Sequence, residues 1–526
     1  MVNKKLVAIS IFAGIFISLA IFSFISFESV CIKFIYNFMQ MKNNSIAFKY
    51  YKDFPVDLRC NVYFFNVTNA NEIVEFGSKP RLQEIGPFVY KLYFNKTDVK
   101  FNGNDTLTFY EKRTWYFDAS KSAFNDDLQI TTINGPLVTA LTLIQTVPNP
   151  LRYLLTRLIE SIESNLFIKR TVRELMFDGY ADPFAALGPL LDPSLINNHG
   201  KFGYMYPNKN ASTDSLFTVF AGANISKFTL IDKLDRKAKL DLWLTDECNQ
   251  INDATNGESR PSLLQHPMQQ IKIYQPLICR AILMNFTSET ITKDGIAAQR
   301  FVMDKNMLRN ASDYPPNSCY ESKIPKKSKA TEKEAEVEIN GNNILESLIN
   351  AFTSNVNEKG KRETMQFPSG VMDFSKCYFG APALVSLPHF LHADPYYSRT
   401  IDGLKPNEDK HEFWIDVEPI TGISVDAALR FQINFHINKP SGIHKFKKVP
   451  EIVFPVFWQE IVIIWPESFA SLIRTLFKAL HLSPTILFSI FISIAIILLL
   501  TFVYKIVKVK RSYIHFATMT KTVSND

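Results

Sequence analysis

The chain has 526 residues, of which 46% are hydrophobic and 21% are charged, and its formal net charge is +7. Most of this charge comes from the two ends of the chain, where seven basic residues outnumber one acidic residue: Lys4, Lys5, Lys505, Lys508, Lys510, Arg511 and Lys521 against Asp526. The residues between these ends carry about +1, so the basic total indicates membrane topology and excludes a nucleic-acid-binding role argued from charge.

Two long apolar segments without charged residues bracket the chain, at residues 6–27 and 482–504. At about 1.5 Å per residue, each spans roughly 33–35 Å, which is enough to cross a hydrocarbon core of about 30 Å. A cleaved signal peptide is the alternative for the first segment. The apolar region of a signal peptide is usually about 7–15 residues long and is followed by a cleavage site of small residues. This segment is longer and ends in Phe24–Glu28, so an uncleaved anchor is favoured.

Basic residues flank the outer ends of both segments, which predicts cytoplasmic tails at residues 1–5 and 505–526. Residues 28–481 would then form an extracellular or lumenal ectodomain. Eight glycosylation sequons all fall in this region, at Asn43, Asn66, Asn95, Asn104, Asn210, Asn224, Asn285 and Asn310. Four of the six cysteines cluster in it and indicate disulfides in an oxidising compartment, namely Cys248, Cys279, Cys319 and Cys377. Spacing alone leaves three ways to pair them.

The first third of the ectodomain has the composition of β-strands. Strands are expected at Cys60–Val67 and Thr114–Asp118, and Asn102-Gly103 between Val99–Phe101 and Leu107–Tyr110 predicts a hairpin with a tight primed turn. Late strands are expected at Glu412–Glu418, Leu429–Ile437 and Glu451–Phe457. We find no repeat and no long linker, so one intertwined domain is the simplest interpretation.

Helices are expected between these groups of strands. Leucine and isoleucine recur with helical spacing over residues 151–162, and Thr171–Glu174 and Asp182-Pro183 have the pattern of helix N-terminal caps. Five cations accompany this region and could form a ligand-facing basic surface: Arg152, Arg157, Lys169, Arg170 and Arg173. The alternative is an ordinary solvated helix face, with Arg170 and Glu174 as a surface pair.

Residues 325–365 differ in character from the rest. Lys326–Glu338 is dense in both signs of charge and predicts a mobile loop. An apolar helical stripe follows, formed by Ile344, Leu345, Leu348, Ile349 and Phe352. It would dock on the ectodomain's own surface or, alternatively, contact a membrane or a partner.

Several segments resemble the class B scavenger receptor family, which includes the fatty-acid translocase, the lysosomal integral membrane protein and the insect sensory neuron membrane proteins. The similar segments occur in the family's order over most of the chain: Phe64–Asn69, Lys79-Pro80, Glu84–Tyr90, Arg170–Leu175, Gly179–Phe184, Ser386–Leu391, Ile401–Asn407 and Asp416–Gly422. The resemblance implies an α+β fold in which two transmembrane helices bracket one ectodomain. That ectodomain would have an antiparallel β-barrel core, a helical apex at about 137–190 and an internal hydrophobic tunnel.

By the same resemblance, Cys248 would pair with Cys319 and Cys279 with Cys377, and ligands would dock at the apex. The implied function is a receptor that binds lipid or lipoprotein and passes fatty acid, sterol or phospholipid through the tunnel to the bilayer. The sequence departs from some relatives because it has one cysteine where they carry a third disulfide, and because neither tail holds a cysteine. The insert at 325–365 is also longer than the family pattern suggests.

Two short patterns suggest further contacts. Tyr513–Phe516 fits an endocytic sorting signal of tyrosine followed by an apolar residue, which would place the protein at the plasma membrane or in endosomal or lysosomal membranes. Ser10, Gly14 and Ser18 repeat every fourth residue in the first span, which would allow close approach of the second span or of a second copy of the protein. The alternative is that small residues are simply common in membrane spans.

Catalytic motifs are missing from the sequence, so no enzymatic activity and no cofactor are expected. His389 and His392, with His411-Glu412, could ligate a metal, but no third convergent ligand is evident, and hydrogen-bonded structural histidines are favoured. Three alternative functions were weighed: a trafficking receptor for a lumenal protein cargo, a two-span ligand-gated channel and an anchored ectoenzyme. Beyond its first four residues, the second span offers only Ser489, Ser493 and Thr501 as serine or threonine positions, which makes an ion path the weaker hypothesis.

Overall fold

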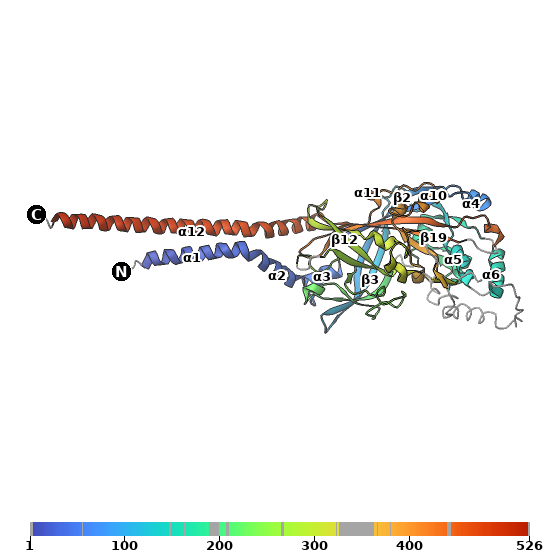
Figure 1. The fold of residues 1–526 in the computed structure, drawn as a ribbon, viewed down its shortest axis with the longest axis horizontal. Coiled ribbons are helices and arrows are strands. Elements are labelled where there is room, and N and C mark those ends of the chain that lie inside the picture. Colours follow the sequence, from blue (N-terminus) through green and yellow to red (C-terminus); the bar gives the residue numbers. More distant parts are fainter. Residues whose placement is uncertain are drawn as a thin grey trace. The chain divides into compact units, whose positions relative to one another are not determined.

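The structure is a computed structural model that describes residues 4–54, 56–146, 149–162, 164–188, 199–206, 210–264, 268–321, 323–325, 362–364, 367–378, 380–438 and 443–523. The chain divides into two compact units (Figure 1). One is a helical unit that comprises residues 1–39, 294–296 and 467–526. The other, here called the central domain, comprises residues 40–293 and 297–466.

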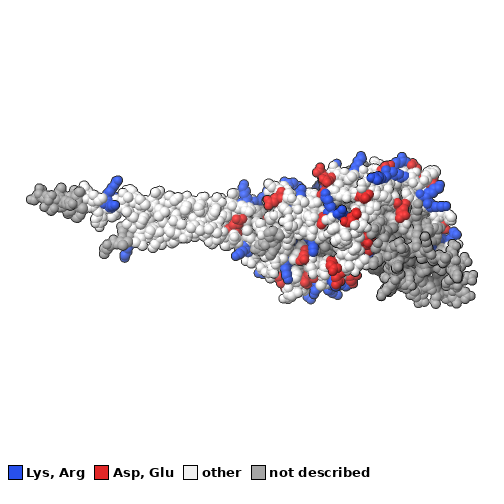
Figure 2. Space-filling view, in the orientation of Figure 1, with Lys and Arg blue, Asp and Glu red and all other residues white. Residues whose placement is uncertain are grey.

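The helical unit contains α1 (Lys4–Ile25), α2 (Phe27–Met39) and α12 (Glu467–Val523). Both α1 and a segment of α12 are long and apolar enough to cross a membrane. Figure 2 shows that the surface of these two helices is free of charged side chains over most of its length, whereas the central domain carries both signs of charge. Within this unit, α1 packs along α12, because Ala13, Ala20 and Ser23 are buried and Phe16 lies 6.1 Å from Phe491 between ring centroids.

A sheet of fourteen strands forms the central domain. Its main path runs β10-β11-β12-β13-β18-β19-β20-β1-β2-β3-β8-β9, and β16 and β17 extend from β19. Their bounds are β1 (Asp57–Val67), β2 (Leu82–Asn102), β3 (Thr106–Phe117), β8 (Asn210–Phe220), β9 (Ile231–Leu234), β10 (Ala254–Thr255), β11 (Gln270–Gln275), β12 (Arg280–Ile291), β13 (Ala297–Met303), β16 (Met372–Asp373), β17 (Ala383–Ser386), β18 (Trp414–Val417), β19 (Ser424–Ile437) and β20 (Ile452–Ile464). All neighbours on this path pair antiparallel except β10 and β11.

The two ends of this path curl toward each other and nearly close a barrel. Phe217 of β8 and Tyr274 of β11, which come from opposite ends of the strand order, lie 6.4 Å apart between ring centroids. The predicted α+β class, with apolar terminal helices bracketing a barrel-like antiparallel sheet, is therefore confirmed. The predicted early and late strands coincide with parts of β1, β3, β18, β19 and β20, and where they extend beyond these strands they do so by one or two residues.

The hairpin between β2 and β3 is present, but its predicted turn is wrong. Asn102 pairs with Thr106, so three residues connect the strands, and the left-handed residue is Asp105 (φ 58°). Asp105 also binds the neighbouring loop, since its carboxylate and carbonyl oxygens accept hydrogen bonds from the backbone N–H groups of Ala223 and Ala221. These contacts favour a wider loop over the tight primed turn.

Short helices and a two-stranded sheet gather at one end of the central domain (Figure 1). The elements are β4 (Gln129–Ile133), α5 (Gly135–Leu143), α6 (Asn149–Ser161), β5 (Phe167–Thr171), a π-helical turn (Glu174–Asp178) and α7 (Pro183–Ala186). Both predicted caps are present: Thr171 and Glu174 exchange hydrogen bonds, and the Asp182 carboxylate accepts from the backbone of Phe184. The pair of strands β6 (Tyr180–Ala181) and β7 (Lys201–Phe202) lies beside α7.

Four more helices complete the described central domain: α3 (Ile46–Lys52), α4 (Ala70–Phe76), α10 (Pro395–Thr400) and α11 (Glu408–His411). The predicted insert at 325–365 is described only at its ends, where β14 (Lys323–Pro325) pairs with β15 (Arg362–Thr364). Its apolar stripe at 344–352 lies outside the described residues.

Candidate functional site

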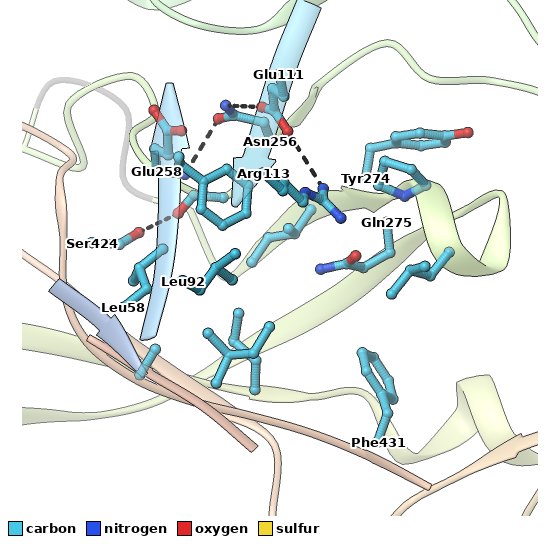
Figure 3. A pocket seen from close by; sticks show the side chains of 18 of the residues that line it. Leu58, Leu92, Glu111, Arg113, Asn256, Glu258, Tyr274, Gln275, Ser424 and Phe431 are labelled. Carbon is cyan, nitrogen blue, oxygen red and sulfur yellow. Dashed lines mark hydrogen bonds and ion pairs between the residues drawn. The ribbon is translucent and has the colours of Figure 1, made fainter. Parts of the chain in front are cut away.

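The central domain contains a cavity of about 130 Å³ inside its curled sheet (Figure 3). Its walls come from β1, β2 and β3 on one part of the sheet and from β11, β17, β18, β19 and β20 on the other. Most of the lining is apolar and includes Leu58, Leu92, Leu429, Phe431, Ile461 and Ile463. Its apolar walls suit a hydrophobic group such as part of a hydrocarbon chain.

The alternation of the strands creates these walls. Successive side chains of a strand point to opposite faces, so Leu429, Phe431 and Ile433 of β19 all face the cavity. The intervening Arg430 points to the other face, where its guanidinium forms an ion pair with Glu460 at 2.7 Å. On this part of β19, the charged side chain therefore finds its partner away from the cavity.

One part of the cavity wall is polar and carries buried charges. The Lys96 ammonium lies 2.5 Å from Glu258 and donates a second hydrogen bond to the carbonyl oxygen of Tyr51 at 2.8 Å. Lys96 is only 3% exposed, so this ion pair is removed from water. Burial raises the pKa of the Glu258 carboxyl above its ordinary value, and the Lys96 charge opposes that shift.

Further polar side chains adjoin this pair at the cavity wall (Figure 3). Asn256 donates to the Glu111 carboxylate at 2.9 Å, and Arg113 lies 3.5 Å from the same carboxylate. Ser424 donates to the carbonyl oxygen of Gly257. Within this wall the Glu111 carboxylate thus lies beside the Arg113 cation and accepts a hydrogen bond from Asn256.

Gln459 of β20 is a polar side chain in the apolar part of the wall. It is 6% exposed, and its Oε1 atom is buried without a hydrogen-bond partner among the described residues. Its neighbours in register are Phe431 on β19 and Val62 on β1, which offer only apolar side chains. The sequence prediction did not include Gln459, because nothing in one sequence tells which face of β20 lines a cavity.

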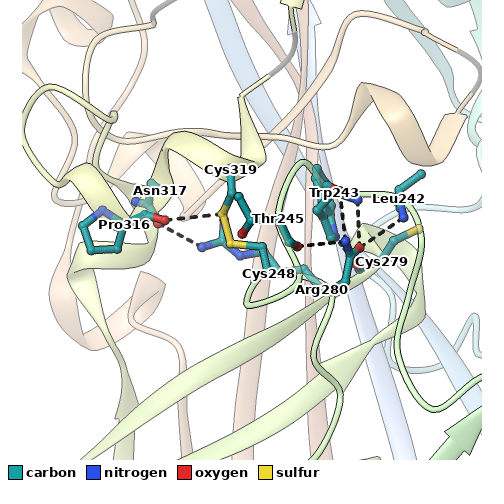
Figure 4. Close-up of a disulfide and its surroundings, with 10 residues drawn as sticks. Leu242, Trp243, Thr245, Cys248, Cys279, Arg280, Pro316, Asn317 and Cys319 are labelled. Atoms are coloured by element: carbon teal, nitrogen blue, oxygen red, sulfur yellow. Dashed lines mark hydrogen bonds between the residues drawn. A yellow bond between two sulfur atoms is a disulfide. The ribbon is translucent and has the colours of Figure 1, made fainter.

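Two disulfides cross-link residues 248–377, the segment that contains strands β11, β12 and β13. The structure joins Cys248 to Cys319, with a Cα–Cα distance of 6.4 Å (Figure 4). It also joins Cys279 to Cys377, with a Cα–Cα distance of 6.2 Å. Next to the second bridge, the Trp243 indole donates to the carbonyl oxygen of Cys279. The two other cysteines, Cys31 and Cys60, carry free thiols.

The five predicted apex cations lie in different surroundings. Arg173 forms an ion pair with the buried Asp126 at 2.5 Å, and Arg157 lies 3.0 Å from Glu160 on its own helix.

The remaining three also differ among themselves. Arg170 lies over the ring of Tyr180, Arg152 donates to the carbonyl oxygen of Gln145, and Lys169 is exposed. Glu174 caps Thr171, so the suggested Arg170–Glu174 pair is replaced by other contacts. The side chains of Arg157 and Lys169 face solvent, and neither forms an ion pair with a buried carboxylate as Arg173 does.

The predicted sequon asparagines differ in exposure. Those exposed are Asn43, Asn95, Asn104 and Asn224, and those partly buried are Asn66, Asn285 and Asn310. Asn66 lies on β1, and its side-chain oxygen accepts a hydrogen bond from the backbone of Thr131. The side chain of Asn210 lies outside the described residues.

Two of the predicted histidines have structural partners. His389 bonds Glu84 through Nε2 at 2.6 Å, and its Nδ1 accepts from the backbone of Lys405. His411 Nδ1 accepts from the backbone of Asn407, and burial together with the neighbouring His389 lowers the pKa of His411 to about 4. The His411 ring therefore serves as a neutral hydrogen-bonding group.

His392 has a different environment, because two carboxylates approach it. Its Nε2 lies 2.8 Å from Glu412 and 3.9 Å from Glu408, and these three groups could hold a metal ion. The sequence prediction missed Glu408, although its spacing of one helical turn from Glu412 was the available signal. The hydrogen bond between His392 and Glu412 by itself accounts for their approach, and the Glu408 side chain is 71% exposed.

The two remaining predicted contacts lie in the helical unit. Ser10, Gly14 and Ser18 are exposed, and α1 meets α12 through the face of Ala13 and Ala20 instead. The suggested contact of the small-residue stripe with the second span is thus wrong within this unit, and the contact with a second copy stays a prediction. Tyr513 is 74% exposed on α12, and the side chain of Phe516 lies outside the described residues.

Comparison with known proteins identifies the family. The sequence model of the CD36 family matches residues 8–506. This chain belongs to the CD36 family. It is 29% identical to scavenger receptor class B member 1 of Sus scrofa, over 91% of this chain and 85% of that protein. It is 30% identical to the Mus musculus protein of the same name, over 79% and 72%.

A second group of relatives has a different printed name. Lysosome membrane protein 2 of Rattus norvegicus is 29% identical, over 82% of this chain and 80% of that protein. The resemblance found in the sequence is confirmed, and with its two apolar terminal helices the chain is a membrane protein of this family. The names of these relatives leave open which ligand the present chain takes.

Proposed function

We propose that this protein is a membrane-anchored receptor that holds a lipid in the cavity of its central domain and passes it to the bilayer. The single observation that carries this proposal is the cavity of about 130 Å³ with apolar walls inside the curled sheet. Relatives named scavenger receptors support a receptor function.

The apolar wall supplies the free energy for such a function. Each methylene group that leaves water for an apolar environment gains about 0.8 kcal/mol, so an acyl chain has a strong preference for this cavity over solvent. Leu429, Ile433 and Ile461 are only partly buried although they face the interior, which means that the cavity leaves their surfaces uncovered. A bound hydrocarbon would cover them.

The proposal includes a topology and a compartment. Both termini would be cytoplasmic, because basic residues precede the first apolar segment and follow the second. The central domain would then be extracellular or lumenal, in agreement with its sequons and disulfides. Its relatives' names support the plasma membrane or a lysosomal membrane as the location.

A docking surface for larger ligands would lie at the helical end of the central domain. Arg157 on α6 and Lys169 on β5 are solvent-facing cations there, and Tyr153 and Leu158 on α6 are exposed beside them. This combination suits an anionic, partly apolar particle such as a lipoprotein or a lipid vesicle.

Native mass spectrometry of the full-length protein tests the cavity. We expect the purified protein to carry co-purified lipid, and the substitution Leu429→Trp to remove it by filling the cavity. Leu154→Trp on the exposed face of α6 is the matched control and should retain the lipid. A protein that never carries lipid, or a Leu429→Trp variant that folds and keeps its full lipid content, would contradict the proposal.

A further inference from the structure

The outer face of β2 and β3 carries an open groove that shares no lining residue with the cavity. Side chains alternate along a strand, so Leu92 and Phe94 of β2 line the cavity and Tyr93 lies on the opposite face. The residues of the groove that the argument needs are Lys91, Tyr93 and Asn95 of β2 and Thr114 and Tyr116 of β3.

Two tyrosines, here called the tyrosine pair, lie exposed in this groove. Tyr93 is 44% exposed and Tyr116 is 54% exposed. Tyr116 pairs in register with Lys91, which places it diagonally across from Tyr93. The two ring centroids are 5.7 Å apart and the ring planes meet at 79°, so the pair forms a corner of aromatic surface. Adjacent aromatic rings that remain in contact with water indicate a surface that another group covers.

A glycosylation sequon lies in the same groove. Asn95 begins the sequence Asn95-Lys96-Thr97, and its side chain is exposed. It follows Tyr93 by two residues on the same face of β2, which is about 7 Å along the strand. Its Nδ2 atom donates a hydrogen bond to the Asp53 carboxylate at 2.8 Å. An amide nitrogen carries two hydrogens, so one can be replaced by a sugar while the other keeps this hydrogen bond.

The chemistry of an N-linked glycan suits the groove. Its first sugar is N-acetylglucosamine, which has apolar ring C–H groups and an acetamido methyl group beside its polar hydroxyls. C–H groups are attracted to the negative face of an aromatic ring. Lys91 and Thr114 line the same groove and can form hydrogen bonds with sugar hydroxyls. The Lys91 ammonium lies 3.5 Å from the Asp118 carboxylate, which holds it at the groove.

A glycan on Asn95 also decides between possible occupants of the groove. It would start inside the groove, next to Tyr93, and its bulk would keep a protein partner or a second copy of the chain away from the tyrosine pair. The sugar is tethered there by a covalent bond, so it covers the rings without the loss of freedom that a separate ligand would incur on binding.

We propose that the glycan on Asn95 folds back onto β2 and β3, and that its first sugar packs into the corner formed by Tyr93 and Tyr116. The sugar then forms part of the surface of the central domain. This inference is independent of the proposed lipid function.

Site-specific deglycosylation of the native protein tests the inference. Full-length protein is purified in detergent from a eukaryotic cell line and treated with a peptide N-glycosidase, and mass spectrometry of its peptides follows release at each asparagine. Asn104 and Asn224 are exposed sequon residues outside the groove and serve as internal controls. The double substitution Tyr93→Thr with Tyr116→Thr should speed release at Asn95 about two- to tenfold, the range for one lost aromatic contact. Release at the control sites should stay unchanged.

Two further variants separate the ring contact from other effects. Tyr93→Phe with Tyr116→Phe keeps both rings and should keep the slow release at Asn95. Thr97→Val abolishes the sequon but retains Asn95 and its hydrogen bond to Asp53. In Thr97→Val, hydroxyl-radical footprinting should find the tyrosine pair more reactive than in the glycosylated protein, and this measurement leaves the tyrosines themselves unaltered.

The reference for the footprinting is Tyr153, which is 65% exposed on α6 and should react equally in both proteins. Three results would overturn the inference: an Asn95 that carries no glycan, a release rate at Asn95 that is unchanged in the double threonine variant, or equal reactivity of the tyrosine pair with and without the sequon. The lipid function would stand in each of these cases.

Discussion

Lys96 shows how a single side chain sets the charge of the cavity wall. Its ammonium is buried against Glu258 and the carbonyl oxygen of Tyr51, and it also lies 4.1 Å from the centre of the Tyr51 ring. Buried ion pairs add little net stability when both partners are present, but removal of one partner leaves an uncompensated charge. The main contribution of Lys96 is therefore to compensate the negative charge of the buried Glu258 carboxylate.

The substitution Lys96→Met should destabilise the protein in a pH-dependent way. Burial already raises the pKa of Glu258, and loss of the opposing cation raises it further, so the folded variant prefers the protonated carboxyl. Stability of the variant is then highest at low pH and is lost as the pH rises through the folded-state pKa. We expect a cost of about 3–5 kcal/mol at pH 8 and less at pH 5, measured as the change in thermal midpoint.

The double substitution Lys96→Met with Glu258→Gln is the control for this prediction. It removes the titrating carboxyl, so the difference between pH 5 and pH 8 should return to that of the unmodified protein. An equal loss at both pH values in the single variant would show that Glu258 does not carry the effect.

At the scale of single elements, α6, β5 and the start of the π-helical turn that follows β5 present cations of two kinds. Arg173 supports the fold, because it neutralises the buried Asp126, whereas Arg157 and Lys169 are bound only at the surface. A test of ligand docking must therefore separate these two kinds of residue.

The double substitution Arg157→Ala with Lys169→Ala should weaken capture of vesicles that contain an anionic phospholipid. Each cation near such a surface contributes about 1 kcal/mol, so the loss of two should lower affinity about tenfold or more. Lys237→Ala removes an exposed, singly paired cation elsewhere and should have no effect. Flotation assays measure the capture. Undiminished capture with both cations removed would argue against docking at this end.

Sequence patterns predict the strands and caps of these elements better than the cavity between them. Alternation in β19 and β20 and the capping residues Thr171 and Asp182 are local signals, and the structure has them. The cavity depends on which strands face one another across the curled sheet. The local sequence of a single strand does not determine which strand it will face. For this reason the position of Gln459 in the wall could not be predicted. Its apolar surroundings come from Phe431 and Val62, which lie on neighbouring strands.

At the scale of the whole molecule, the disulfides close long segments of the central domain. The Cys279–Cys377 bridge joins residues separated by 98 positions, and the segment between them includes β12 and β13. Such a bridge restricts the unfolded chain, and its loss usually costs 2–5 kcal/mol in secreted proteins.

The double substitution Cys279→Ser with Cys377→Ser should lower the thermal midpoint and reduce the amount of protein that reaches the cell surface. A cost of about 2–5 kcal/mol is expected. The substitution Cys31→Ser removes a free thiol and serves as the control, with an unchanged midpoint. Surface biotinylation and a melting curve together measure both effects. Unaltered values in the double variant would contradict a stabilising role of the bridge.

The position of β20 has a consequence for biosynthesis. This strand lies between β19 and β1 in the sheet. The first strand of the central domain, β1, can therefore pair on this side only after β20, the last strand, has been synthesised. The ribosome must release nearly all of the chain before the barrel can close, and until then β1 exposes an unpaired edge that invites aggregation. A premature stop codon upstream of Ile452 would leave β1 and β19 without their shared neighbour, and the product would be a substrate for quality-control degradation.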